Sequence, residues 1–281
     1  MALRGFLTWL ALVAAAQAAT ATGTLPIRLH RDYLVIADCD VPGGGKVNAL
    51  IDTGTTRTIL DRRIADRLRL RTEPGQTIAL NRPMPARVGR LPELRVGPIR
   101  VLNLPVFVLD LEEMSGTLGI HLDMLVGMDV LRGASFTLDY HRRQIVFGVH
   151  TREDAVALDP RLPYLVLVGR LGSTPLRLQV DTGFDGLLLY RDRVPSGTLP
   201  PPRPMQTPRS REMRSMAGPA AETEVEVGDL WIDGLRLAGA RALVLDRAPE
   251  DAQFDGVIGP RGIPVSSITF DFERSAAQMR R

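Results

Sequence analysis

The tripeptide Asp-Thr-Gly occurs twice, and its setting constrains the fold more than any other feature of this chain. Asp52-Thr53-Gly54 and Asp181-Thr182-Gly183 each end an apolar run. Each run is preceded by a glycine-bearing turn and by an earlier apolar run, at 33–36 and at 164–167. Two apolar runs joined by such a turn predict a β-hairpin. One tripeptide alone would be weak, because chance places one in about one chain in twenty of this size.

Landmarks after each tripeptide recur in the same order. Gly127, in Leu125-Val126-Gly127, lies 75 residues after Asp52, and Gly259, in Val257-Ile258-Gly259, lies 78 residues after Asp181. Further strand-like runs with aromatic ends follow at 136–140 and 268–272. Matching order and spacing predict an internal duplication. Short β-like runs with frequent Gly and Pro predict an all-β fold with little helix.

Polar and proline-rich segments suggest how the chain is divided. We place one lobe at residues 19–150 and a second at 151–281, because residues 151–160 are polar and end in Asp-Pro. Residues 64–70 predict one or two helical turns. Residues 72–93 and 191–222 lack periodicity, so we expect long loops that act as lids or are disordered.

The N-terminus has the layout of a secretory signal. Arg4 is followed by an apolar run from Phe6 to Ala16 and then by Ala16-Gln17-Ala18. A bilayer-spanning helix needs about 20 apolar residues, and this run is shorter. We therefore expect residues 1–18 to be a signal peptide cleaved after Ala18, and a periplasmic or secreted mature chain without stable membrane insertion. An uncleaved anchor is the alternative.

Composition argues against several function classes. The net charge is only +3, so nucleic acid is not an expected partner, and the arginine cluster at 203–214 is read as a solvated loop. Cys39, the only cysteine, cannot form an intrachain disulfide and is expected to be packed. The four histidines show no metal-ligand spacing. We expect no metal and no cofactor.

These motifs together resemble the pepsin/retropepsin-type aspartic proteases, in particular the bacterial retropepsin-like group with two domains in tandem. The resemblance covers nearly the whole mature chain. It implies two closed β-barrel lobes in tandem, related by a pseudo-twofold axis in a single chain. It also implies that Asp52 and Asp181 form one catalytic pair.

The resemblance assigns supporting roles to the residues around the pair. Thr53 and Thr182 would cross-link the two loops by hydrogen bonds. The supporting glycines, which would allow close backbone approach, are Gly54, Gly183, Gly127 and Gly259. Two carboxyls this close would share one proton and activate a water for attack on a peptide bond. The implied activity is an exported aspartic endopeptidase, active as a monomer on peptides or unfolded proteins.

One position departs from the family pattern. Thr55 follows the first tripeptide, as expected, but Phe184 follows the second. We expect the Thr55 hydroxyl to bond the first carboxylate, so that Asp52 is the more acidic partner and Asp181 holds the shared proton. Phe184 also motivates the main alternative, a non-catalytic peptide-binding module that keeps the cleft.

The segment 51–58 also resembles the phosphate-binding hairpin of actin/Hsp70-type ATPases. That fold needs a longer chain and further nucleotide loops, and it leaves the second copy unexplained. The stretch 43–46 lacks the outer glycine and the following Ser or Thr of a P-loop. An aspartic peptidase therefore remains the leading hypothesis from the sequence.

Overall fold

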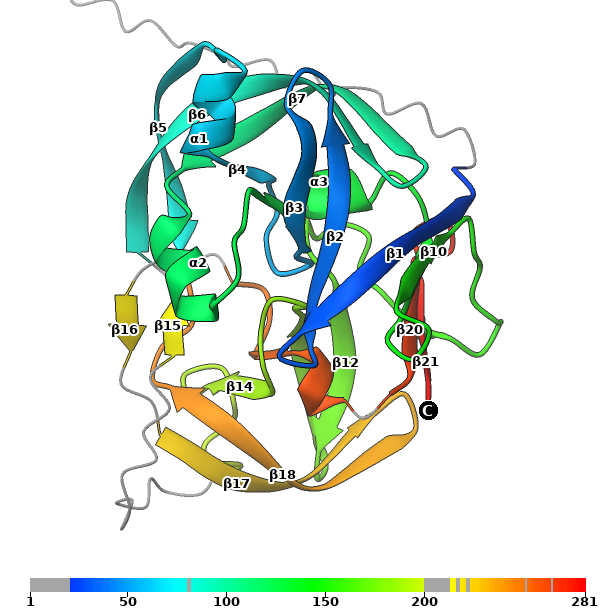
Figure 1. Cartoon of the computed structure of the whole chain (residues 1–281). Helices are drawn as coiled ribbons and strands as arrows, with labels where there is room; N and C mark the ends of the chain where they lie inside the picture. Colours follow the sequence, from blue (N-terminus) through cyan, green and yellow to red (C-terminus); the bar gives the residue numbers. More distant parts are fainter. Residues whose placement is uncertain are drawn as a thin grey trace, which may run out of the picture.

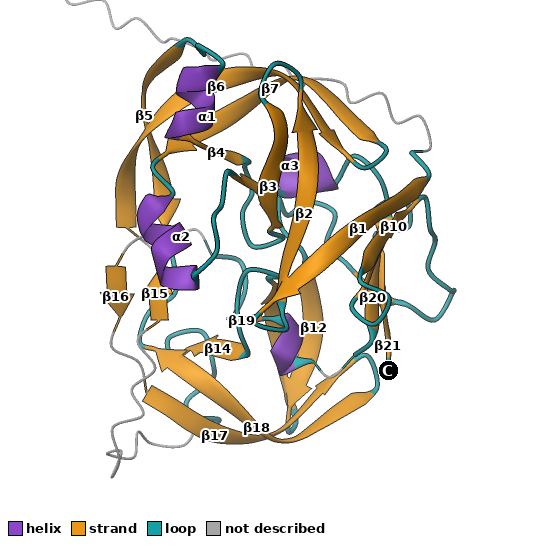
Figure 2. Ribbon diagram, in the orientation of Figure 1, coloured by secondary structure: helices purple, strands orange, loops and turns teal. Residues whose placement is uncertain are grey.

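The computed structural model describes residues 21–79, 82–199, 213–215, 218–220, 223–250, 252–263 and 265–281. Strands dominate this part of the chain (Figures 1 and 2). The helices are α1 (Arg62–Arg67), α2 (Glu112–Leu118), α3 (Met128–Leu131) and the 3-10 turn η1 (Pro260–Gly262). None of the helices in these residues is long and apolar enough to cross a bilayer. The all-β prediction is confirmed, whereas the proposed signal peptide, residues 1–18, lies outside the described residues.

Strands before residue 150 form one set. They are β1 (Gly23–His30), β2 (Leu34–Val41), β3 (Gly45–Ile51), β4 (Ile59–Asp61), β5 (Thr72–Ala79), β6 (Arg82–Val96), β7 (Ile99–Leu109), β8 (Met124–Val126), β9 (Phe136–Asp139) and β10 (Gln144–Phe147). Six of them lie side by side in the order β2-β3-β8-β4-β7-β6, and a β2–β6 pairing joins the two ends. Hairpin β2–β3 is the first hairpin that the sequence predicts.

The later strands repeat this arrangement. They are β11 (Val156–Ala157), β12 (Val166–Leu171), β13 (Thr174–Val180), β14 (Leu187–Tyr190), β15 (Met213–Ser215), β16 (Gly218–Ala220), β17 (Thr223–Ile232), β18 (Leu235–Leu245), β19 (Gly256–Ile258), β20 (Ser267–Asp271) and β21 (Ala276–Arg280). Six of them form a closed barrel in the order β12-β13-β19-β14-β18-β17. Each strand holds the place of its counterpart in the first set. The duplication itself and the boundary at residue 150 stay predictions.

A shared sheet joins the two sets, in the order β11-β21-β20-β9-β10-β1. Its centre is the antiparallel pair β9–β20, in which Thr137 lies opposite Thr269 and Phe136 opposite Phe270. The two hydroxyls are 2.7 Å apart, and the two rings pack with centroids 5.3 Å apart. The equivalent strands β9 and β20 of the two halves are therefore paired neighbours at the centre of the shared sheet.

The segment 72–93 is not the long loop that we expected. It forms the hairpin β5–β6, with register from Thr72↔Gly89 to Ala79↔Arg82. β5 is an edge strand, and β6 pairs with β7 only from Arg87 onward. Pro74 and Pro85 therefore lie where one side of the ladder is open, and their missing N–H groups remove no bond.

Candidate active site

Both tripeptides leave their strands beside a parallel neighbour. Ile51 is paired with Val126 of β8, and the Asp52 N–H donates to the Val126 carbonyl at 3.0 Å. In the second half, the Asp181 N–H donates to the Ile258 carbonyl of β19, also at 3.0 Å. Each aspartate is thus fixed at the point where a hairpin strand ends against a short buried strand.

Gly127 and Gly259 lie where the backbone of the preceding loop passes closest. A methyl group built on Gly127 would come within 2.8 Å of the Arg57 carbonyl carbon. One built on Gly259 would overlap the Phe184 carbonyl. Because these neighbours are backbone atoms, neither can move aside easily. The structure therefore places both glycines where close approach is needed.

Thr53 and Thr182 tie the two loops to each other. The Thr53 N–H donates to Thr182 Oγ1 at 3.0 Å, and the Thr182 N–H donates to Thr53 Oγ1 at 3.1 Å. Each hydroxyl then donates across the same junction, from Thr53 to the Val180 carbonyl at 2.8 Å and from Thr182 to the Ile51 carbonyl at 2.6 Å. Both threonines are fully buried. Four reciprocal bonds therefore hold loops that are 129 residues apart in sequence.

This junction brings the carboxyls of Asp52 and Asp181 together. Gly54 lies directly against the Asp181 carboxyl, and a methyl group on Gly183 would lie 3.1 Å from Asp52 Oδ1. The N–H of each glycine donates to its own aspartate, at 2.8 Å for Gly54 and 2.7 Å for Gly183. Both aspartates keep partial solvent access, so water can reach the pair.

The acidity of both carboxyls departs from that of a free aspartate. Burial raises the pKa of both. For Asp181, the charge of Asp52 and a hydrogen bond to it raise the pKa further, well above the usual range. For Asp52, the N–H of Gly54, the bond from Asp181 and the N–H of Thr55 lower the pKa against the burial effect. Because the charge of Asp52 raises the pKa of Asp181, the pair is expected to hold one shared proton.

The hydrogen bonds to the two carboxyls differ from those expected from the sequence. The Thr55 hydroxyl donates to the Arg57 carbonyl at 3.1 Å, and the donor to the Asp52 carboxyl is the Gly54 N–H, at 2.8 Å. The Phe184 N–H donates to the backbone carbonyl of Asp181 at 3.3 Å, and the donor to the Asp181 carboxyl is the Gly183 N–H, at 2.7 Å. The Phe184 side chain packs against an apolar cluster that includes Val166 and Val257. The missing hydroxyl at residue 184 therefore removes no bond to a carboxylate.

Polar contacts also fix the segments just after each tripeptide. Asp129, which follows Gly127, accepts from the Thr58 N–H at 3.0 Å and from its hydroxyl at 2.7 Å. In the second half, Arg261 donates to Asp185 at 3.4 Å. Asp185 thus anchors its loop to η1. Asp129, and Gln179, whose Nε2 donates to the Gly54 carbonyl at 3.1 Å, were not singled out in the sequence.

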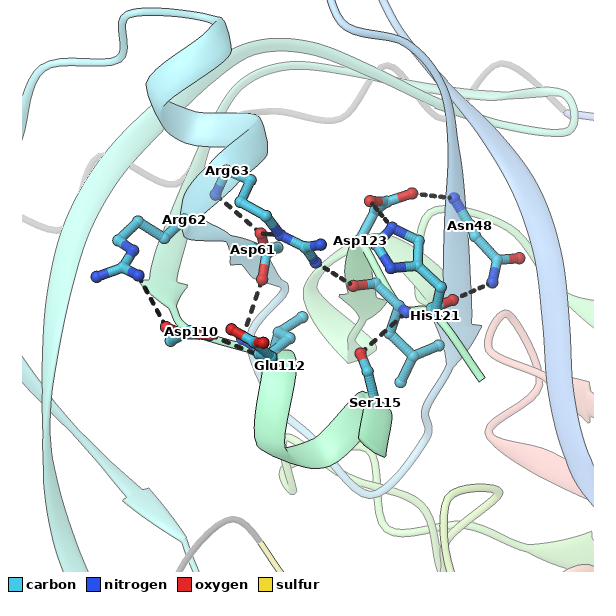
Figure 3. Close-up of polar contacts among 11 residues, drawn as sticks. Asn48, Asp61, Arg62, Arg63, Asp110, Glu112, Ser115, His121 and Asp123 are labelled. Atoms are coloured by element: carbon cyan, nitrogen blue, oxygen red, sulfur yellow. Dashed lines mark hydrogen bonds and ion pairs between the residues drawn. The ribbon is translucent and has the colours of Figure 1, made fainter. Parts of the chain in front are cut away.

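A separate polar network aligns the far ends of the strands that lead to the site. In Figure 3, Asp123 accepts from the Asn48 N–H, at 2.9 Å, and lies beside His121. Asp61 accepts from the Arg63 side chain at 2.7 Å and from the Leu111 N–H at 3.0 Å. A cavity of about 550 Å³ lies beside α2, lined by Arg63, Glu112, Ser115, Gly116, Gly119, Ile120 and His121. It contains no member of the aspartate pair, and the network serves to hold β3 and β8 in register.

Four further carboxylates lie at or directly after the ends of strands. Asp271 is fully buried and accepts from the Thr151 N–H at 2.9 Å and the Arg274 N–H at 3.1 Å. Burial alone would raise its pKa, but these donors and His150 outweigh it and lower the pKa. The other three accept from N–H groups or pair with arginines: Asp110 with the Glu112 N–H and Arg62, Asp139 with the Arg142 N–H, and Asp246 with Arg191.

Other side chains show no sign of cofactor chemistry. Cys39 is buried, and burial, with the charges of Asp40 and Asp38, raises the pKa of its thiol to about 12. A thiol with that pKa stays protonated and is a poor nucleophile. Within the described ranges, no group of three or more His, Cys, Asp or Glu side chains is placed to hold a metal ion.

Two comparisons with known proteins found a match. Residues 37–130, which include the first tripeptide and Gly127, match the aspartyl protease family. Among solved structures, the chain is similar to the crystal structure of a retropepsin-like aspartic protease from Rickettsia conorii, at 20% identity and a TM-score of 0.34. That match covers 45% of this chain and 90% of the other. No curated protein matches the chain.

Proposed function

We propose that this chain, whose residues 37–130 match the aspartyl protease family, is an exported aspartic endopeptidase. The observation that carries the proposal is the reciprocal bonding of Thr53 and Thr182, which brings Asp52 and Asp181 into contact. Paired carboxyls that share one proton and are open to water are what general acid–base attack on a peptide bond requires.

The chemistry follows from one proton shared by the pair, which we assign to Asp181. Ionised Asp52 accepts a proton from a water held between the carboxyls, while that water attacks the peptide carbonyl carbon. Protonated Asp181 donates its proton to the carbonyl oxygen, giving a neutral diol. Proton transfer from Asp52 to the amide nitrogen then lets the C–N bond break. The amine leaves, the new carboxyl group forms, and Asp181 recovers the diol proton.

Cleavage of peptides by the purified exported chain tests this function. We expect cleavage of a mixed peptide library that pepstatin inhibits, and none by Asp52→Asn or Asp181→Asn, because both carboxyls serve the reaction. Both variants should fold, as judged by circular dichroism. Cleavage that persists in either folded variant would reject the dyad mechanism.

A non-catalytic peptide-binding module remains the second candidate. Phe184 motivates it, although the Thr55 hydroxyl at the equivalent position also donates to a backbone carbonyl and not to its carboxylate. Wild-type protein that binds but does not cleave peptides from acidic to neutral pH would favour this module.

Export and the monomeric state are part of the same proposal. Cleavage after Ala18 would leave the first described strand, β1 from Gly23, intact. Intact-mass analysis of the exported protein should give a chain that begins Ala19-Thr20, and retention of Met1 in a membrane fraction would favour an anchor. We expect one chain per particle in light scattering, because both aspartates come from the same chain.

A further inference from the structure

Arg57 is an exposed cation in the first active-site loop. It lies three residues after Gly54, which lies directly against the Asp181 carboxyl. The Thr55 hydroxyl donates to the Arg57 carbonyl at 3.1 Å, so the loop turns tightly between these two residues. An extended chain spans at most about 3.6 Å per residue, which places the Arg57 backbone within about 11 Å of Gly54. Arg57 therefore lies at the edge of the space that a substrate on the aspartate pair would occupy.

An aromatic ring holds the side chain of Arg57. The guanidinium carbon lies 5.6 Å from the centroid of the Phe107 ring, which is a cation–π contact. Phe107 packs against the cluster that contains Leu50, two residues before Asp52, and Met84 of hairpin β5–β6. The ring thus keeps the cation next to both the strand that leads to Asp52 and the hairpin.

Among the described residues, no carboxylate forms an ion pair with Arg57. Asp129, the acid of the adjoining segment, accepts from the Thr58 N–H with both oxygens at 3.0 Å and from the Thr58 hydroxyl at 2.7 Å. Its oxygens are therefore directed at the loop and not at the guanidinium. The planar fork of donors on an arginine matches the geometry of a carboxylate. An arginine placed in this way can bind a carboxylate that a substrate brings.

The second half has no such cation at the equivalent place. Gly186 lies three residues after its tripeptide, and no atom lies within 4 Å of the point where its side chain would begin. The neighbouring strands show the same difference, because the place of Arg90 in the β6–β7 ladder is taken by Glu226 in the β17–β18 ladder. Glu73 of β5 offsets only one of the two first-half arginines. Positive charge is therefore in excess on one side of the aspartate pair.

We propose that Arg57 determines specificity by binding an aspartate or glutamate of the substrate, about two to four residues from the scissile bond, on the side held by the first half of the chain. An extended peptide advances about 3.4 Å per residue, so such a residue lies about 7 to 14 Å from the scissile bond. That is the range in which Arg57 lies. The inference rests on the proposed function for its effect on cleavage, and the class of substrate that it names is an acidic peptide.

Cleavage-site profiling with a mixed peptide library tests the proposal on the full chain. In wild type, Asp and Glu should be favoured over Asn and Gln by about 1.4- to 5-fold in kcat/KM, which is the range of an exposed ion pair. The preference should occur on one side of the scissile bond only. Arg57→Gln should lose it, Arg57→Lys should retain it, and Arg57→Glu should favour Lys and Arg instead. Salt at about 0.5 M should weaken the preference, because the pair is exposed.

Arg67→Gln is the matched control, because it removes the same charge far from the site. Arg67 Nη1 donates to the Gly44 carbonyl, in the β2–β3 turn, at 3.4 Å. Gly44 and Asp52 flank opposite ends of the seven-residue strand β3, so they are about 20 Å apart. This variant should keep the preference of wild type.

The outcomes separate the two proposals. Wild type without a preference for acidic residues, or an unchanged preference in folded Arg57→Gln, overturns the role of Arg57. An equal loss in Arg67→Gln also overturns it, since a general charge effect would produce that result. Fluorescence anisotropy with a Glu-containing peptide and its Gln counterpart gives a readout that needs no cleavage. A wild type that binds the Glu peptide more tightly through Arg57, but cleaves neither, rejects the peptidase and leaves the recognition standing. Binding of neither peptide rejects both proposals.

Discussion

Replacing Thr182 by valine should destabilise the chain strongly although the side chain keeps its shape. The hydroxyl accepts from the Thr53 N–H and donates to the Ile51 carbonyl, and Thr182 is fully buried. Valine leaves both backbone groups without that partner in a place that excludes water. Each unsatisfied buried group costs about 1–3 kcal/mol. The free energy of unfolding of Thr182→Val should therefore fall by about 2 to 6 kcal/mol.

Urea denaturation of wild type, Thr182→Val and Thr182→Ser measures this loss. Serine keeps the hydroxyl and removes one buried methyl group, so it should cost only about 1 kcal/mol. Thr53→Val should match Thr182→Val, because the two threonines have reciprocal roles. A loss below about 0.5 kcal/mol in Thr182→Val, or an equal loss in the serine variant, would refute the reasoning.

Three further results are expected. The folded-state pKa of Asp181 is raised above its unfolded-state value. The stability linked to its protonation is therefore complete below the unfolded-state pKa and is lost as the pH rises through the folded-state pKa. In urea titrations, Asp181→Asn should be more stable than wild type at pH 7 but not at pH 3. Phe184→Ser should leave the basic limb of the pH–rate profile in place, because the Thr55 hydroxyl also avoids its carboxylate. Met84→Ser should weaken peptide binding in fluorescence titrations without unfolding the chain, if hairpin β5–β6 covers substrate; unchanged affinity would count against a lid.

Testing whether hairpin β5–β6 acts as a lid requires a substitution, because the deletion that would suit a loop does not suit a hairpin. Removing residues 83–87 from a loop would leave the fold intact. Those residues pair with β5, and Arg87 also pairs with Val108 of β7. Deletion would therefore break the sheet. A substitution at Met84, whose side chain packs partly against the cluster around Leu34 and Leu111, is the cleaner change.

Features with a periodic or repeated signal could be predicted from the sequence. Hairpins β2–β3 and β12–β13, and the strands β8 and β19, follow from apolar runs that occur twice. Hairpin β5–β6 could not, because its prolines interrupt the alternation that marks a strand, and only the edge position makes them acceptable. The hydrogen-bond partner of the Thr55 hydroxyl could not be predicted either, because a short side chain can bond either a carboxylate or a nearby backbone carbonyl.

Gln179 was missed for another reason. A single polar residue in an apolar run reads as an exposed strand position, whereas this one is buried and bonds a group 125 residues away in sequence. The signal that would have found it is the alignment of the two halves, where Leu50 and Gln179 differ at an otherwise apolar position. The sequence shows the difference, but only the structure shows the Gly54 carbonyl that the amide meets.

The β9–β20 ladder has a consequence for how such a site can change over generations. In a site shared by two identical subunits, one substitution in the gene changes both halves of the site. Here the halves meet through Phe136 and Phe270 inside one continuous chain, so each half can accept substitutions that the other does not. The join also keeps the halves at a fixed effective concentration, which no dilution lowers. Because both aspartates lie in one continuous chain, the residues around each can change independently, as Leu50 and Gln179 show at equivalent positions.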